Sequence, residues 1–197
     1  MKRVHIKPGY LPMKLHFFFG VILFFLVASM ESPAAPFNIE VSKSKQELRV
    51  IQDHKIIKRF YIAYGKGGTG YKQKLGDNKT PVGIYRIAEL KSDSKFYYFL
   101  QLNYPNLVDA WHGYKNELIS ARVFKEIATA YKNKQLPPQD TPLGGYIGIH
   151  GIGEITQEKL DIHNLYNWTE GCIALKNEEI KELLKYISIG TQVVIKD

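Results

Sequence analysis

The feature of this sequence that most constrains its fold is a series of short segments in which apolar and polar residues alternate. Phe37 to Val41 and Glu47 to Gln52 both show the alternation, and the turn residues Asp53 and His54 separate them from a β-branched and aromatic segment at 55–64. A period of two places successive side chains on opposite faces of a strand. The pattern therefore predicts a β-meander at the start of a mainly β domain.

The same pattern continues to the end of the chain, with two helical interruptions. We expect further strands at 80–90, 95–102, 145–150, 172–175 and 191–196, and a glycine-rich loop at 65–77. Apolar residues at near-helical spacing predict a helix over 117–131, and Asn177 is expected to cap a second helix that ends near Ile187. The predicted fold class is mainly β, with a sandwich-like mixed or antiparallel sheet and about two helices.

The N-terminal segment reads as a targeting signal rather than as part of the fold. Residues 1–16 are basic, Phe17 to Ala28 form one apolar run, and small residues follow. Such a run is short for a membrane span but suits the apolar region of a secretory signal. We expect residues 1–35 to be a signal peptide or an uncleaved N-terminal anchor, and residues 36–197 to form one domain in the periplasm or cell envelope.

The net charge of +8 does not indicate a nucleic-acid partner. Four of the basic residues lie in residues 1–30, which contain no acidic residue. The remaining lysines are scattered and form no stripe or run, whereas nucleic-acid binding requires clustered charge. We therefore expect no nucleic-acid partner, and contact with a membrane only through residues 17–28.

The only cysteine, Cys172, is the strongest candidate for chemistry. One cysteine forms no internal disulfide and no cysteine-based zinc site. A thiol is a strong nucleophile when a base is near, and the preceding Gly171 allows a tight turn that aims the Gly171 and Cys172 amides at a developing oxyanion. The alternative is a buried, inert thiol.

Three histidines are candidates for the base, and the residues alone do not choose among them. His150 ends a predicted strand, where a rigid element would hold it. We expect His112 and His163 in loops, with satisfied polar roles. No zinc-like grouping surrounds His150, and the glycine-rich loop lacks the GK[ST] ending of a nucleotide-binding loop.

Four short motifs give the chain a specific resemblance. Residues 76–85 read GDNKTPVGIY, similar to a GDxxTPxGxY segment; YPN follows at 104–106, HG at 150–151 and GC at 171–172. Together, in this order, they resemble the YkuD-type catalytic domain of the L,D-transpeptidases, which act on bacterial peptidoglycan. The resemblance covers about 37–197, and the sequence around Cys172 is most similar to the branch of the family that includes YafK and DpaA.

The resemblance implies a role for each matched residue. Cys172 would be the nucleophile and His150 the general base, oriented by the backbone carbonyl of Gly151. The amides around Gly171 and Cys172 would form the oxyanion hole. The family also implies a sandwich-like fold with a substrate cleft under a mobile loop, and a reaction without cofactor or metal.

Two positions depart from the family's usual pattern. Glu170 replaces a histidine two places before the nucleophile, and a carboxylate there opposes thiolate formation unless it points away. Ala174 replaces an arginine that often shapes the acceptor site. The remaining candidates for contact with substrate are Trp168, Thr169, Glu170, Tyr146 and Trp111.

The predicted function is a cysteine acyltransferase acting on peptidoglycan stem peptides through a thioester. A hydrolase that cleaves a linkage to the diamino acid, for example one that releases an outer-membrane lipoprotein, is the first alternative; an amino acid is another possible acceptor. A non-catalytic peptidoglycan-binding module is the second. Sortases need an arginine shortly after the cysteine, and papain-like enzymes place cysteine before histidine, so both fit poorly.

Overall fold

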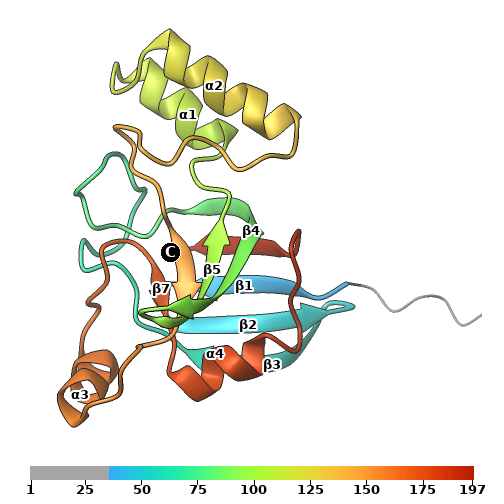
Figure 1. Ribbon diagram of the computed structural model, residues 1–197, viewed down its shortest axis with the longest axis vertical. Coiled ribbons are helices and arrows are strands. Elements are labelled where there is room, and N and C mark those ends of the chain that lie inside the picture. The colour runs from blue at the N-terminus through green and yellow to red at the C-terminus, as the bar shows by residue number, and fades with distance from the viewer. Residues whose placement is uncertain (1–35) are drawn as a thin grey trace, which may run out of the picture. The chain divides into compact units, whose positions relative to one another are not determined.

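A computed structural model describes residues 36–197, which form one mixed eight-stranded sheet with four helices (Figure 1). The strand order across the sheet is β3-β2-β1-β8-β4-β5-β6-β7. The strands are β1 (Asn38–Ser42), β2 (Glu47–Gln52), β3 (Lys55–Tyr61), β4 (Gly83–Ser94), β5 (Tyr97–Leu102), β6 (Gly148–His150), β7 (Ile173–Ala174) and β8 (Gln192–Lys196). The mainly β fold class predicted from the sequence is confirmed.

The first three strands form the predicted antiparallel meander. Every second residue of β1 and β2 is buried, including Ile39, Val41, Leu48 and Val50. Burying such an aliphatic side chain stabilises the fold by about 1.5–3 kcal/mol. The last strand, β8, lies parallel to β1 and antiparallel to β4, so the C-terminal strand joins the meander to the rest of the sheet.

The long strand β4 bends the sheet back on itself. Its first residues pair with β8, and after a register shift near Ile87 its later residues pair with β5. Beyond β3, Ala63 exchanges two backbone hydrogen bonds with Ala174 of β7, of 3.1 and 2.8 Å, so the two ends of the sheet meet. The sheet therefore encloses one apolar core, which agrees with the sandwich-like expectation.

The four helices are α1 (Leu107–Lys115), α2 (Ala121–Lys132), α3 (Gln157–Leu165) and α4 (Asn177–Leu183). The two predicted helices are present as α2 and α4, each shorter than expected. Helices α1 and α3 were not predicted, so the expected loop positions of His112 and His163 are wrong. Asn177 does not cap α4, because Lys176 occupies the cap and Asn177 is the first helical residue.

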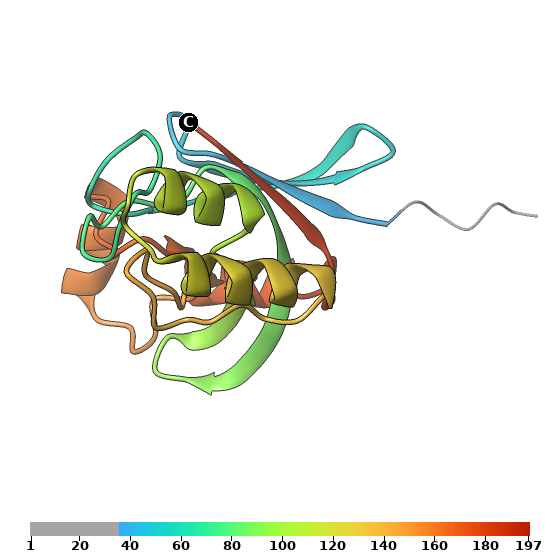
Figure 2. The same ribbon diagram turned by 90° about the horizontal axis from the view of Figure 1, so that it is seen from above.

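Helices α1 and α2 follow β5 and precede β6 along the chain. They pack against each other as a helical hairpin with a small core of its own (Figures 1 and 2). That core contains Ala110, Ile119, Ile127 and Leu143. Helix α4 instead contributes Ile180 and Leu183 to the main core. The hairpin and the sheet are thus stabilised by separate apolar clusters.

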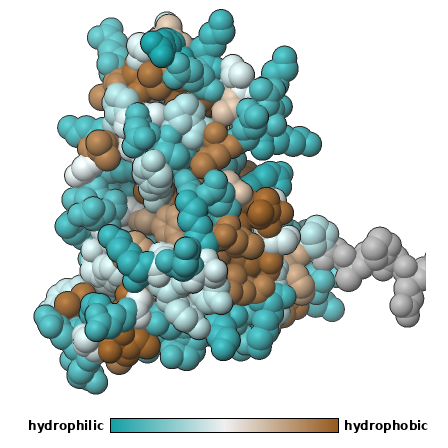
Figure 3. All heavy atoms as spheres, viewed as in Figure 1, coloured by the Kyte–Doolittle hydropathy of each residue, from teal (hydrophilic) through white to brown (hydrophobic). Residues whose placement is uncertain are grey.

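The surface view in Figure 3 shows apolar side chains in a few separate groups among hydrophilic ones. Among residues 36–197, no helix is both long enough and apolar enough to cross a lipid bilayer. The predicted signal or anchor at 1–35 lies outside the described residues.

Candidate active site

Strands β6 and β7 place His150 and Cys172 on the same face of the sheet. The two strands are parallel and pair Ile149 with Ile173 and His150 with Ala174. Ile149 and Ile173 both point into the main core. Because side chains alternate along a strand, His150 and the residue just before Ile173 face the other side. Cys172 therefore lies diagonally across from His150.

His150 is held in one orientation by a backbone carbonyl and by aromatic rings. Its Nδ1 lies 2.7 Å from the carbonyl oxygen of Gly151, to which Nδ1–H donates. The ring stacks on Phe96 with centroids 4.3 Å apart and is only 2% exposed. Burial lowers the pKa of His150 to about 4. At neutral pH the imidazole is therefore uncharged, with Nε2 available as the proton acceptor.

The neighbouring backbone fits glycine at position 151. A Cβ there would lie 2.6 Å from Oδ1 of Asn177 and 2.7 Å from the carbonyl oxygen of Phe96. The same Asn177 side chain accepts from the amides of Ile152 and Gly153. Asn177 thus fixes the loop that carries the orienting carbonyl, a role that its expected position as a cap did not suggest.

Cys172 is a protonated thiol in this setting. Its Sγ lies 3.5 Å from the carbonyl oxygen of Tyr146. Burial raises the pKa of Cys172 to about 11; the Gly148 amide and the charge of Lys72 act against this shift, and Glu170 adds to it. The site therefore holds a neutral thiol and a neutral imidazole, rather than a preformed ion pair.

The turn before the cysteine is fixed by Thr169. Its buried hydroxyl accepts from the Gly171 amide at 3.2 Å and donates to the Cys172 carbonyl at 2.6 Å. Gly171 has a φ of +132°, and a Cβ there would lie 2.9 Å from the carbonyl oxygen of Lys79. The Gly171 amide is thus engaged by Thr169, whereas the Cys172 amide makes no hydrogen bond within residues 36–197.

Trp168 and Glu170 point in different directions. The Trp168 ring meets His150 edge-to-face with centroids 5.8 Å apart, and its Nε1–H donates to Nδ1 of His163 at 3.4 Å. The Glu170 side chain is 83% exposed and lies 3.9 Å from the Lys66 ammonium. Trp168 therefore forms a wall of the site, and Glu170 points outward.

Tyr146 and Trp111, the other two candidates for contact with substrate, lie in different parts of the fold. Tyr146 is exposed, and its amide donates to Gln139 while its carbonyl receives the thiol. Trp111 lies on α1, where it packs against Phe124 of α2 with Lys115 over its ring. The structure brings Tyr146 to the cysteine and leaves Trp111 in the helical hairpin.

The sequence reasoning missed a buried ion pair beside the site. The Lys72 ammonium, 2% exposed, lies 2.6 Å from Oδ1 of Asp77. Asp77 also accepts from the amides of Gln73, Lys74 and Lys79, and its hydrogen bonds hold its pKa below the usual value against the desolvation. The GD motif carried the signal, because it contains Asp77 and suggests that the loop is built around a carboxylate.

His163 was also misjudged. It is fully buried in α3 rather than exposed in a polar loop, and its Nε2 has no hydrogen-bond partner among the described residues. Burial lowers its pKa to about 4. No group of three or more His, Cys, Asp or Glu residues that could hold a metal ion occurs within 36–197.

Comparison with known proteins places this geometry in context. The model of the YkuD family, the L,D-transpeptidase catalytic domain, matches residues 36–195. The chain is 30% identical over 160 residues to YafK of Escherichia coli (strain K12), whose name assigns it to the L,D-transpeptidases; the match covers 78% of this chain and 48% of YafK.

Two solved structures share the fold. Bd1075 of Bdellovibrio bacteriovorus is 25% identical with a TM-score of 0.52, covering 83% of this chain and 49% of that one. The helical cell shape determining protein Pgp2 of Campylobacter jejuni is 24% identical with a TM-score of 0.51, covering 82% and 48%. The chain spans about half the length of these relatives.

Proposed function

This chain belongs to the YkuD family of L,D-transpeptidase catalytic domains, and from that membership we propose that it is a cysteine acyltransferase of peptidoglycan stem peptides. The observation that carries the proposal is the parallel pairing of β6 with β7, which brings His150 beside the turn that carries Cys172. The Nδ1–H of His150 donates to the Gly151 carbonyl, so the lone pair of Nε2 is left to act as the base.

In the proposed acylation step, His150 Nε2 takes the Cys172 proton while Sγ attacks the stem-peptide carbonyl of the diamino acid. The Cys172 amide donates to the oxyanion. The tetrahedral intermediate then collapses, the C–N bond breaks, and protonated His150 gives its proton to the leaving amine. A thioester between the peptide and Sγ results.

In the second step an amine or water attacks the thioester. His150 removes the proton from the attacking group, and the departing Sγ recovers it. An amine acceptor makes the enzyme a transpeptidase, and water makes it a hydrolase. Both reactions need the same two residues, so the active-site pair is common to the two candidates.

Hydrolysis is the second candidate because of Ala174. This residue, which replaces the arginine of the family's usual pattern, is fully buried, and its backbone is hydrogen-bonded to Ala63. No cation extends from that position to hold an acceptor. The substrate of such a hydrolase would be peptidoglycan carrying a lipoprotein or amino acid on its diamino residue.

We place this chemistry in the cell envelope, in remodelling of the wall and of cell shape. The apolar run at 17–28 supports export, and Pgp2 of Campylobacter jejuni, which shares the fold, is a helical cell shape determining protein. Peptidoglycan is the proposed partner in both reactions.

The test is mass spectrometry of muropeptides incubated with the protein and with its Cys172→Ala variant. New dimers or exchanged terminal residues identify a transpeptidase, and loss of a linked group without new cross-links identifies a hydrolase. If folded protein gives no cysteine-dependent change with lipoprotein-linked or unlinked peptidoglycan, the proposal is wrong and a binding module is favoured.

A further inference from the structure

His163 is a fully buried titratable residue that the proposed reaction does not use. It lies in α3, and Figure 1 shows this helix at the end of the domain opposite the hairpin of α1 and α2. His163 is also the only buried residue of α3. Because buried positions are more often apolar, a buried histidine in such a helix calls for a specific partner.

The partner of His163 is the indole of Trp168. The Nε1–H of Trp168 donates to Nδ1 of His163 at 3.4 Å. Because an indole N–H can only donate, Nδ1 is the unprotonated nitrogen of the imidazole and the proton is on Nε2. Nε2 is buried and has no hydrogen-bond partner among the described residues. An apolar side chain would avoid this unpaired donor, so the acceptor at Nδ1 explains the histidine better than stability does.

The backbone on both sides of Trp168 is held by hydrogen bonds. Oδ1 of Asn167 accepts from the Tyr64 amide at 3.1 Å, and the Thr169 amide donates to the Tyr64 carbonyl at 3.2 Å. With its backbone held, Trp168 can still rotate its indole about the side-chain torsions. The hydrogen bond to His163 restricts that rotation.

The imidazole of His163 is itself held in place. The Tyr61 ring of β3 meets it edge-to-face with centroids 5.9 Å apart, and the Tyr61 hydroxyl donates to the Asn164 carbonyl of α3 at 3.3 Å. On its other side the Trp168 indole meets the His150 imidazole, with centroids 5.8 Å apart. Contacts therefore run from β3 through His163 and Trp168 to the base of the proposed reaction.

We propose that His163 is a positioning residue, which holds the Trp168 indole against His150 and so keeps water away from the base. The inference rests on the proposed function for the role of His150, but the positioning can be measured without the reaction. Burial is the largest cause of the low pKa of His150, and the indole is one of the rings around it, with Phe96 and Phe99. If the indole turned away, water would reach the imidazole and the pKa of His150 would rise towards 6.5.

Other titratable groups also act on the two imidazoles. The charge of His163 lowers the pKa of His150, and the charge of Lys176 lowers the pKa of His163. The Cys172 thiol is neutral, because burial raises its pKa to about 11. A test of the positioning must therefore keep these charges the same in the proteins that it compares.

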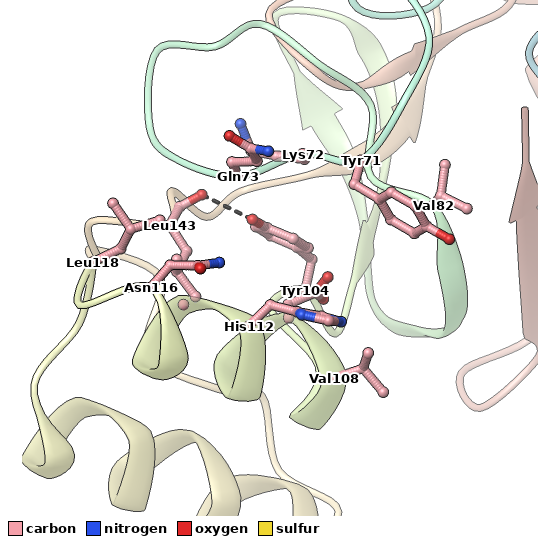
Figure 4. A pocket seen from close by; sticks show the side chains of 12 residues that line it. Tyr71, Lys72, Gln73, Val82, Tyr104, Val108, His112, Asn116, Leu118 and Leu143 are labelled. Carbon is pink, nitrogen blue, oxygen red and sulfur yellow. Dashed lines mark hydrogen bonds between the residues drawn. The ribbon is translucent and has the colours of Figure 1, made fainter.

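Two variants of similar size isolate the acceptor. His163→Asn keeps an acceptor, because Oδ1 of asparagine is bonded to Cγ as Nδ1 of histidine is, whereas His163→Leu has none. Both lack the charge of His163, so a difference between them reports the hydrogen bond to Trp168. His163 does not line the pocket of about 360 Å³ between α1 and the loop before β4, whose walls include Tyr104 and Asp109 (Figure 4). Both variants therefore leave the lining of that pocket unchanged.

The first measurement is nuclear magnetic resonance of the isotope-labelled full chain carrying Cys172→Ala, which needs no substrate. We expect the pKa of His150 in His163→Asn to stay close to that of the parent, and in His163→Leu to be higher by about 1 or more. The indole N–H of Trp168 should exchange with solvent faster in His163→Leu than in His163→Asn.

The second measurement is the pH profile of muropeptide turnover in proteins that retain Cys172. On acidification from about pH 8 to about pH 5.5, kcat of His163→Leu should fall by up to about tenfold relative to the parent, because a His150 with a raised pKa is protonated there. KM should change less than about twofold, and His163→Asn should follow the parent. A purely structural role would instead lower kcat equally at every pH, together with Tm.

The proposal is overturned if the pKa of His150 is the same in His163→Leu and His163→Asn, or if the Trp168 indole N–H exchanges equally fast in both. These results come from the inactive protein, so they are distinct from a failure of the proposed function, which is a lack of cysteine-dependent turnover. If His163→Leu does not fold, His163→Phe gives the same test, because it keeps a ring against Tyr61 and lacks the acceptor.

Discussion

Two regions bury polar groups in different ways: the candidate active-site edge, made of β6 and β7 with their flanking turns, and the hairpin of α1 and α2. At the edge, His150 and Thr169 are satisfied by backbone atoms of the next residues, and His150 is left uncharged. In the hairpin, the buried Asp109 carboxylate accepts from the Tyr85 hydroxyl and from the Asn106 amide, as the capping residue in the first turn of α1. Burial therefore lowers the pKa of a base at the edge, whereas it raises the pKa of an acid in the hairpin.

The two regions should also differ in how well they tolerate substitutions. Strands β6 and β7 are short and fully buried, so the fixed turns at 151–153 and 169–172 carry the geometry. The hairpin has an apolar core of its own, made of Ala110, Ile119, Ile127 and Leu143. Substitutions of the same type should therefore have large effects at the edge and small ones in the hairpin.

The largest expected effect is on turnover, at His150. His150→Gln removes the base, and we expect kcat to fall by about 10²–10⁴-fold, the usual contribution of general acid–base catalysis. His54→Gln, in the exposed turn between β2 and β3, is the matched control and should leave kcat unchanged. The turnover of muropeptides by each variant measures kcat. If His150→Gln is as active as the parent protein, another residue is the base.

Two glycines sharpen the comparison next. Gly151→Ala puts a methyl group against the Phe96 carbonyl and the anchored Asn177 side chain, so we expect at least about tenfold loss of activity and a lower Tm. Gly113→Ala in α1 instead meets the flexible end of Leu143, at 2.7 Å. Repacking there is offset by a gain in helix propensity of about 1 kcal/mol.

Thermal unfolding and activity assays of the two variants test this contrast. Equal losses of Tm would show that the hairpin is packed as tightly as the edge. Loss of Tm without loss of activity in Gly151→Ala would show that the orienting carbonyl tolerates displacement.

The pH dependence of stability should have opposite signs in the two regions. The folded pKa of His150 lies at about 4, below its ordinary value of 6.5, so the unfolded chain takes up its proton first and stability falls between pH 6.5 and 4. The folded pKa of Asp109 lies at about 6, above its ordinary value of 3.8, so its contribution improves as pH falls from 6 to 3.8. Each amounts to roughly 3 kcal/mol at the acid limit.

Urea unfolding of the protein and of Asp109→Asn and His150→Gln at several pH values separates the two contributions. We expect the stability of Asp109→Asn to fall more steeply on acidification than that of the parent, and that of His150→Gln to fall less steeply. Parallel curves for all three proteins would contradict the assigned pKa values.

The same contrast explains what could be predicted from the sequence. Alternation in Phe37 to Val41 and in Glu47 to Gln52 predicted the meander, because one face of each strand is buried. Helix α3 was not predicted, because the helix has no apolar face and His163 is its only buried residue. The ion pair of Lys72 with Asp77, and the pocket at Asp109, depend on contacts between loops and elements far apart in sequence, and such contacts have no periodicity to detect.

Cys172, as the single cysteine, and His150, at a strand end, were predicted to act together, and their catalytic roles stay predictions. The substrate contacts expected of Trp111 and Thr169 also stay predictions. Residue type suggested them, whereas orientation depends on the final packing: Trp111 meets Phe124, and the Thr169 hydroxyl meets backbone atoms of its own turn.

The smallest expected effect concerns that hydroxyl. Thr169→Val keeps the shape of the side chain but leaves the Gly171 amide and the Cys172 carbonyl without this partner, at a cost of about 1–3 kcal/mol of unfolding free energy. Thr129→Val, at an exposed position on α2, removes a hydroxyl that water already solvates and should change stability by less than about 0.5 kcal/mol. Urea unfolding gives both free energies of unfolding, and kcat for Thr169→Val reports whether the nucleophile is displaced.

A stable Thr169→Val protein with reduced kcat would mean that the hydroxyl positions Cys172 rather than supports the fold. If Thr169→Val matches the parent protein in both stability and kcat, the Thr169 hydroxyl is not needed. The conformation of Gly171 and the hydrogen bond from Thr80 to the Cys172 carbonyl would then hold the turn.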